Sequence, residues 1–170
     1  GTLATQNVAE PKVYRRPLAG VITTGSELCA VGEALTGGKI VNSNRYTFQG
    51  VLQDAGCVTE FFGCPGDSVD EIAEVMASAG QACDLIVTTG GVSVGDYDLT
   101  PAALQAAGGE ILIQNMQLKP GGKCCFGTLG KAIVCCLSGN PASSMTAFYA
   151  AVLPMVRKLC GRKDWALEKI

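Results

Sequence analysis

Hydrophobic residues along this chain form short continuous runs, and the segments between the runs carry them at helical spacing. Continuous apolar runs are typical of strands buried on both faces of a sheet, whereas a three-to-four-residue spacing is typical of helices that cover one. The runs predict strands over residues 18–24, 57–63, 82–89, 110–118, 123–129 and 132–137. The spaced patterns predict helices over residues 43–55, 68–79, from 100 onward and 141–160, and the glycine-rich residues 25–39 are expected to form a loop.

Strands that alternate with helices predict an α/β fold with three layers, α/β/α, around a mostly parallel sheet. Gly130 and Lys131 separate two predicted strands, so a β-hairpin is expected there. Thr100 is expected to cap a helix with Pro101 in its first turn. Pro154 is expected to kink the last helix, because proline lacks the backbone N–H that a helix interior needs.

Three segments of different character suggest how the chain is organised. Residues 1–17 are polar and irregular, and we expect them to be a linker from an upstream domain. Residues 18–161 carry the regular pattern and are expected to form one domain, a length sufficient to bury a single sizeable core. Residues 162–170 are expected to be a tail toward a downstream domain.

Composition narrows the class of protein. Of the 170 residues 48% are hydrophobic and 16% are charged, which favours a compact fold over disorder. The net charge of −2 lacks the basic excess of a nucleic-acid-binding protein, so no nucleic-acid partner is expected. No apolar stretch is long enough for a membrane span, and residues 1–10 lack a signal-peptide pattern. We therefore expect a cytoplasmic protein with no membrane partner.

The chain contains nine cysteines and no histidine. The absence of histidine excludes histidine-based catalysis, including the serine triad, and no cysteine pair has the Cys-x-x-Cys spacing of common zinc sites. Most of the cysteines lie in apolar runs, where a free thiol behaves as a small hydrophobic side chain. The predicted hairpin places Cys125 across from Cys136, and the sequence leaves open whether these two are bridged.

Polar, glycine-rich segments follow four of the predicted strands. In open α/β sheets, ligands bind beyond the carboxyl ends of the strands. We therefore expect these segments to converge on one rim and to form a crevice for an anion or a nucleotide. The segments are residues 23–27, 66–67, 89–98 and 138–141.

Two of these segments have backbone groups suited to phosphate. Gly90 and Gly91 permit the backbone angles of a concave anion nest. Asn140 is expected to cap the last helix with Pro141 in its first turn, which directs free N–H groups and the positive dipole end toward the crevice. Further hydroxyl donors are expected at Ser143 and Ser144.

Charged side chains near the same rim suggest metal and oxyanion chemistry. Carboxylates at Glu27, Asp67 and Asp98 are suited to Mg²⁺, which takes oxygen ligands, and Lys119 is suited to an oxyanion. Several of these candidates have a purely structural alternative. Asp67 and Ser68 precede a helix, and Ser68 with Glu71 has capping-box spacing. A glycine pair after a strand is usually a turn, and a loop lysine is usually solvated.

Several sequence blocks, taken in order, resemble the molybdopterin-binding domain of MoeA- and gephyrin E-type molybdenum insertases. Each block alone is a weak signal, but their order and spacing across residues 17–161 are specific. The blocks are TGSEL at 24–28, GKIVNSNR at 38–45, TTGGVSVG at 88–95 followed by Asp98, KPG at 119–121 and SGNP at 138–141.

The resemblance implies an enzyme of molybdenum cofactor biosynthesis, a molybdopterin molybdenumtransferase. Such an enzyme binds adenylylated molybdopterin, inserts molybdate and releases AMP, with Mg²⁺ at the phosphates. The resemblance also implies a dimer for the full-length protein, and the isolated domain is expected to be inactive alone. By position it implies catalytic roles for Asp67, Asp98 and Lys119 and metal binding by Glu27 and Asp98. The implied substrate-binding residues are Thr24, Gly25, Ser26, Asn42, Ser43, Asn44, Thr89, Gly90, Gly91, Val92, Ser93, Ser138, Gly139, Asn140, Pro141 and Ser143.

Four positions depart from the family pattern. Asn115 replaces a lysine, Gly122 a basic residue, Ser138 a proline and Asn42 an aspartate. Fewer positive charges should weaken the attraction for molybdate, and the sequence leaves open molybdate versus tungstate. Two alternatives also stay open: a non-catalytic binding or scaffold module of the same fold, and a CinA-type nucleotide-processing domain. The CinA type normally has GLGPT after the glycine pair, whereas residues 92–95 here are VSVG.

Overall fold

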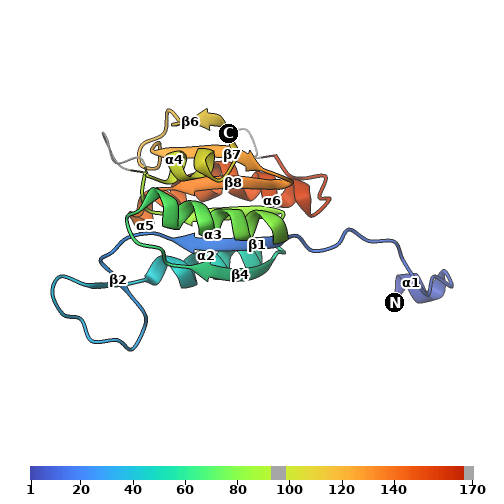
Figure 1. The fold of residues 1–170 in the computed structure, drawn as a ribbon. Coiled ribbons are helices and arrows are strands. Elements are labelled where there is room, and N and C mark those ends of the chain that lie inside the picture. Colours follow the sequence, from blue (N-terminus) through green and yellow to red (C-terminus); the bar gives the residue numbers. More distant parts are fainter. Residues whose placement is uncertain (93–98, 167–170) are drawn as a thin grey trace.

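A six-stranded sheet forms the centre of the computed structural model, which describes residues 1–92 and 99–166 (Figure 1). The strand order is β4-β1-β5-β8-β7-β6. The first four strands of this order are parallel, and β7 and β6 are added as antiparallel neighbours. The bounds are β1 Leu18–Thr23, β4 Val58–Gly63, β5 Leu85–Thr89, β6 Glu110–Gln114, β7 Cys124–Leu129 and β8 Ala132–Leu137.

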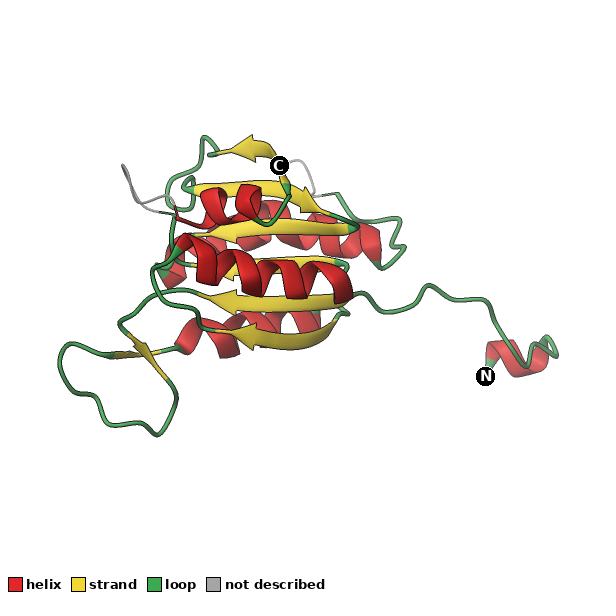
Figure 2. Ribbon diagram, viewed as in Figure 1, coloured by secondary structure: helices red, strands yellow, loops and turns green. Residues whose placement is uncertain are grey.

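Helices cover both faces of this sheet, which confirms the predicted three-layer α/β/α fold (Figure 2). One hydrophobic core lies between the sheet and the face covered by α2, α5 and α6, and it includes an edge-to-face contact between Phe48 and Phe148. The second core lies under α3 and α4. The helices are α2 Ser43–Asp54, α3 Val69–Ala82, α4 Leu99–Ala106, α5 Pro141–Ala147 and α6 Leu153–Leu159, with a π-helix, η1 Phe148–Val152, between the last two.

The residues of β1 show why the central strands lack polar alternation. Ala19 and Val21 pack into the first core, while Ile22 packs into the second. The chain leaves β1 through α2 to reach β4, and it then passes through α3 on the opposite face to reach β5. Because the connections diverge between β1 and β5, a crevice opens beyond the carboxyl ends of these two strands.

Three predicted boundaries were wrong by three or more residues. Helix α3 continues to Ala82 rather than ending at residue 79. The next strand, β5, begins at Leu85 rather than at residue 82, because its pairing with β1 begins at Leu85. Strand β6 ends at Gln114 rather than at residue 118. The reason lies in Asn115, which has a left-handed φ of 63° that a strand cannot continue through. Residues 115–123 therefore form a loop.

The start of α4 also differs from the prediction. The helix includes Leu99, so Thr100 lies within it rather than capping it. The Thr100 side chain is fully buried, and its hydroxyl donates to the Gly90 carbonyl at 3.4 Å. Thr100 thus fixes the turn after β5.

The last helix is interrupted where Pro154 was expected to kink it. Helix η1 ends at Val152, and Pro154 lies in the first turn of α6. A proline ring collides with the carbonyl four residues earlier in a regular α-helix, and the wider π turn accommodates it. A further difference is that residues 25–39 are not entirely loop, because β2 Leu28–Cys29 pairs with β3 Ile40–Val41.

The hairpin of β7 and β8 confirms the expected two-residue turn. Leu129 pairs with Ala132, and Cys125 lies opposite Cys136. None of the nine cysteines forms a disulfide, so the two facing cysteines are not bridged. No helix within residues 1–92 and 99–166 is long and apolar enough to span a membrane.

The N-terminal segment, with the short helix α1 Thr2–Thr5, extends away from the sheet (Figure 1). Its last residues are tied to the domain. Arg15 forms two short hydrogen bonds with the Asp84 carboxylate, at 2.5 and 2.6 Å, and Arg16 donates to the carbonyls of Gly56 and Cys57. Hydrogen bonding from Arg15 lowers the pKa of Asp84.

Candidate functional site

A pocket of about 320 Å³ lies beyond the carboxyl ends of β1, β5 and β8, and we call it the rim pocket. The four polar segments that were predicted to converge all contribute to its wall. Residues from β3 and the start of α2 complete it. The lining residues are Thr24, Gly25, Glu27, Leu28, Ile40, Asn44, Asp67, Thr89, Gly90, Gly91, Val92, Ser138, Gly139 and Asn140.

The closest backbone approach in the rim pocket joins the turns after β1 and β5. Gly90 has a φ of 101°, and a Cβ atom there would lie 2.4 Å from the Thr24 carbonyl oxygen, so only glycine fits. The Thr24 hydroxyl is buried and has no hydrogen-bond partner among the described residues. A buried polar group without a partner is costly, and this one belongs to a residue that lines the rim pocket.

The expected nest at the glycine pair is only partly available. The Gly90 N–H donates to the Leu137 carbonyl at 3.0 Å, which joins β5 to β8 and removes this donor from any ligand. For the Gly91 N–H no acceptor is present within the described part of the chain. One backbone donor rather than two therefore remains for an anion at this turn. Val92 lines the pocket but also packs against the core under α3 and α4.

Asn44 joins two walls of the rim pocket. Its Nδ2 donates to the Gly139 carbonyl at 2.9 Å, and its Oδ1 is buried without a hydrogen-bond partner in the described residues. The neighbouring Asn42 is instead committed to the fold, because its Oδ1 caps α2 by accepting from the Arg45 N–H and its Nδ2 donates to the Thr23 hydroxyl at 2.7 Å. Neither Asn42 nor the exposed Ser43 lines the rim pocket.

Two carboxylates reach the rim pocket from different strands. Glu27 is exposed on the segment after β1, and Asp67 is exposed on the segment after β4. Ser26 donates to Asp67 through its hydroxyl at 2.7 Å and its N–H at 3.1 Å, and these bonds lower the pKa of Asp67. Ser68, not Asp67, caps α3. Asp98 and Ser93 lie outside the described residues, within which no group of three or more metal-binding side chains occurs.

The predicted Asn140 cap of the last helix is confirmed, but Ser143 and Ser144 do not provide hydroxyl donors to the rim pocket as expected. Asn140 Oδ1 accepts from the Ser143 N–H at 3.1 Å, and Pro141 is exposed in the first turn. The Ser144 hydroxyl is buried and donates to the carbonyls of Asn140 and Pro141, so it is not directed at a ligand. Ser143 lines a different pocket.

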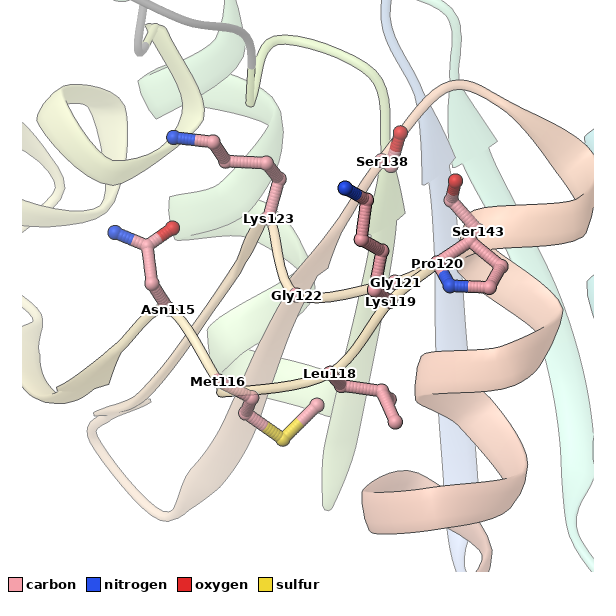
Figure 3. A pocket seen from close by; sticks show the side chains of 10 residues that line it. All are labelled: Asn115, Met116, Leu118, Lys119, Pro120, Gly121, Gly122, Lys123, Ser138 and Ser143. Atoms are coloured by element: carbon pink, nitrogen blue, oxygen red, sulfur yellow. The ribbon is translucent and has the colours of Figure 1, made fainter.

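That second pocket, of about 510 Å³, contains Lys119 and Lys123, and we call it the lysine pocket (Figure 3). Gly121 holds its loop against α5, because a Cβ atom at this residue would lie 2.7 Å from the Ser143 carbonyl oxygen. The Lys119 side chain extends toward the side where Ser138 lies (Figure 3). The lining residues are Asn115, Met116, Leu118, Lys119, Pro120, Gly121, Gly122, Lys123, Ser138 and Ser143.

The two pockets divide the predicted catalytic residues. Asp67 lines the rim pocket and Lys119 the lysine pocket, and Ser138 belongs to both. Of the positions that depart from the family pattern, Asn115, Gly122 and Ser138 all line the lysine pocket. The sequence blocks predicted one crevice and gave no sign of this division.

One residue beside the site was missed. Lys39 donates to the Ser26 carbonyl at 2.5 Å, on the segment that carries Glu27. The contact depends on the pairing of β2 with β3, and two strands of two residues each leave no periodic signal in a sequence.

Comparison with known proteins gives consistent matches. The sequence pattern of the family described as "probable molybdopterin binding domain" matches residues 20–158. A molybdopterin molybdenumtransferase of Haemophilus influenzae is 39% identical over 163 residues, which are 96% of this chain and 40% of the relative. A protein of the same name from Nostoc sp. is 35% identical and matches 96% of this chain and 38% of its own length. The chain thus spans about 40% of these relatives.

Solved structures agree with the fold. A crystal structure of a molybdopterin biosynthesis MoeA protein from Pyrococcus horikoshii has a TM-score of 0.85 at 26% identity and covers 95% of this chain and 40% of its own. A CinA protein from Thermoplasma acidophilum has a TM-score of 0.67 at 19% identity and covers 85% of this chain and 98% of its own. At that identity the second likeness extends to the fold alone.

Proposed function

Because this chain belongs to the molybdopterin-binding domain family of molybdenum cofactor biosynthesis, we propose that it binds adenylylated molybdopterin in the rim pocket and takes part in molybdate insertion with release of AMP. The whole protein would then be a molybdopterin molybdenumtransferase. The observation that carries the proposal is the meeting of blocks 24–28, 88–92 and 138–140 in one pocket with unpaired polar atoms.

The rim pocket suits the phosphate-bearing part of such a substrate. The Thr24 hydroxyl and the Gly91 N–H are donors without a partner in the described chain, and the Asn44 side-chain oxygen is an acceptor. Donors that are fixed before a ligand arrives lose little free energy to reorganisation, so they favour an anion strongly in a partly dry pocket. The exposed Glu27 carboxylate on the same wall fits Mg²⁺, which typically takes one or two carboxylates together with substrate phosphate. We assign the second carboxylate to Asp98.

The lysine pocket suits the oxyanion. Lys119 and Lys123 supply positive charge, while Ser138 and Ser143 supply hydroxyl donors. Molybdate placed there would lie next to a pterin ester in the rim pocket, because Ser138 lines both spaces. Chemistry of this kind needs orientation and charge screening more than covalent help from the protein. The proposal includes a cytoplasmic location and a dimer of the full-length protein.

Calorimetric titration with AMP and Mg²⁺ tests the rim pocket directly. We expect binding by the wild-type chain and about tenfold weaker binding by Asn44→Ala, which removes a hydrogen-bond acceptor for an N–H or O–H group of the nucleotide. Gln49→Ala on the same helix is the matched control and should bind as the wild type does. Absence of AMP binding by both the chain and its full-length parent would refute the proposal.

Cofactor formation by the full-length protein tests the enzymatic part. Asp98→Asn should reduce the rate, because a neutral amide is a weaker ligand of Mg²⁺ than a carboxylate. An unchanged rate would remove Asp98 from the site. If AMP binds but no cofactor forms in the wild type, the non-catalytic binding module becomes the better description, and the altered residues of the lysine pocket would explain it.

A further inference from the structure

The segment after β1, which carries Glu27, is held by two side chains. Asp67 lines the rim pocket, whereas Lys39 lines a different pocket. On one side, the Asp67 Oδ2 atom accepts both the N–H and the hydroxyl of Ser26. On the other side, the Lys39 ammonium donates to the Ser26 carbonyl. All three polar groups of Ser26 are thus occupied by two residues distant in sequence.

Backbone bonds fix the residues on the far side of Glu27 in the same way. The Glu27 carbonyl accepts from the Ile40 N–H at 2.9 Å, and the Leu28 N–H donates to the Gly25 carbonyl at 3.1 Å. The Glu27 carboxylate folds back over Gly25, where a Cβ atom would lie 2.5 Å from one of its oxygens. The position of this carboxylate in the rim pocket therefore depends on a segment whose two ends are both tied.

We propose that Lys39 and Asp67 form a clamp on Ser26 and act as positioning residues for the Glu27 carboxylate. The inference rests on the proposed function for its ligand, but the clamp itself is a property of the chain. It gives Asp67 a role different from the catalytic one that the family resemblance implies. Asp67 would act as a hydrogen-bond acceptor for Ser26, and its negative charge would be secondary.

This difference makes the clamp testable, because substitutions can remove the charge of Asp67 while keeping its hydrogen-bond acceptor, or remove both. An asparagine at residue 67 keeps an oxygen that can accept from the Ser26 N–H and hydroxyl, whereas a leucine of similar size cannot. Likewise Lys39→Arg keeps a cationic donor, and Lys39→Met removes it while keeping the length of the side chain. Lys131→Met, at the hairpin turn, is the control for loss of one exposed positive charge.

The first measurement is hydrogen exchange of the amides of residues 26–28 and 40 in the chain without ligand. We expect about tenfold faster exchange in Asp67→Leu and Lys39→Met, and near wild-type exchange in Asp67→Asn, Lys39→Arg and Lys131→Met. Equal protection in all variants would overturn the clamp. Because Lys39 is exposed, its variants decide the question even if Asp67→Leu does not fold.

The second measurement is the affinity for AMP with and without Mg²⁺. We expect Asp67→Leu and Lys39→Met to lose about tenfold in Mg²⁺-dependent affinity and to keep the Mg²⁺-independent part, because the displaced group is Glu27. If Asp67→Asn loses as much as Asp67→Leu, the charge of Asp67 is what acts and the positioning role is wrong. If neither the wild-type chain nor its full-length parent binds AMP, the proposed function fails, while the exchange result on the clamp still stands.

Discussion

Thr24 and Gly90 form the tightest contact in the rim pocket, and a single added carbon atom would disturb it. In Gly90→Ala the new Cβ atom would lie 2.4 Å from the Thr24 carbonyl oxygen, on a backbone with a φ of 101°. We expect the free energy of unfolding to fall by about 2 kcal/mol, since strained backbone and collision add. AMP affinity should fall with it. Chemical denaturation and calorimetric titration provide the two readings.

Gly130→Ala is the matched control for this substitution. Gly130 also has a positive φ, of 57°, but no atom lies within 4 Å of the position of its missing Cβ. Alanine there would meet a milder backbone strain and no collision, because a φ of 57° lies in the left-handed region that other residues can adopt at moderate cost. Gly130 also lies in the hairpin turn, outside both pockets. Equal losses in the two variants would show that the contact with Thr24 has no special weight.

At the scale of elements, the hairpin of β7 and β8 brings four cysteines together inside the protein. Cys124 and Cys135 belong to one core and Cys125 and Cys136 to the other, and all four are buried. Burial raises the pKa of Cys135 far above its ordinary value. A thiol that is both buried and protonated is a poor nucleophile, so these residues serve as packing.

Thiol labelling of the native protein should follow this arrangement. Cys64 is exposed and should react first, and the partly exposed Cys160 should follow more slowly. The remaining thiols should react only after unfolding, and burial raises the pKa of Cys57 to about 12 and that of Cys83 to about 11. Mass spectrometry after timed alkylation would count them. Cys64→Ser should abolish the fast step, and fewer than nine thiols in denaturant would reveal a bridge that the structure lacks.

The elements also show what the sequence could predict. Apolar runs predicted all six strands of the main sheet. Burial on both faces explains the clear signal of β1, β5, β7 and β8, whereas the edge strands β4 and β6 are apolar but largely exposed or partly buried. The end of β6 was not predictable, because it depends on the backbone angle of Asn115 rather than on hydrophobicity. The convergence of the four loops was predictable from the topology of parallel strands, whereas Lys39 and the separation of Lys119 from Asp67 depend on contacts between distant segments.

At the scale of the whole molecule, the departures from the family pattern are distributed unevenly between the rim pocket and the lysine pocket. The rim pocket keeps its family blocks apart from Ser138, while the lysine pocket lacks positive charge at Asn115 and Gly122. Under the proposed function, we therefore expect the domain to bind the nucleotide part of the substrate better than the oxyanion. This difference in expected affinity appears only when the two pockets are compared with each other.

Asn115→Lys tests this imbalance. A lysine at this position should raise the affinity for molybdate about fivefold, the value of one added charge in a solvent-open pocket. AMP affinity should not change, because Asn115 does not line the rim pocket. Equilibrium binding of molybdate at low salt is the measurement, and Asn115→Gln is the uncharged control. An equal gain in both variants would show that charge is not what this pocket lacks.

Within residues 1–92 and 99–166, Ser138 alone is common to the walls of the two pockets. Its hydroxyl accepts from the Asn140 N–H at 3.2 Å, so a shift of Ser138 would also reach the cap of α5. Any occupant that moves this serine therefore changes the space offered to its neighbour. By thermodynamic reciprocity, whatever factor the nucleotide imposes on oxyanion affinity, the oxyanion must impose on the nucleotide. If the nucleotide and the oxyanion bind as proposed, the serine shared by the rim pocket and the lysine pocket would couple their binding, either cooperatively or antagonistically.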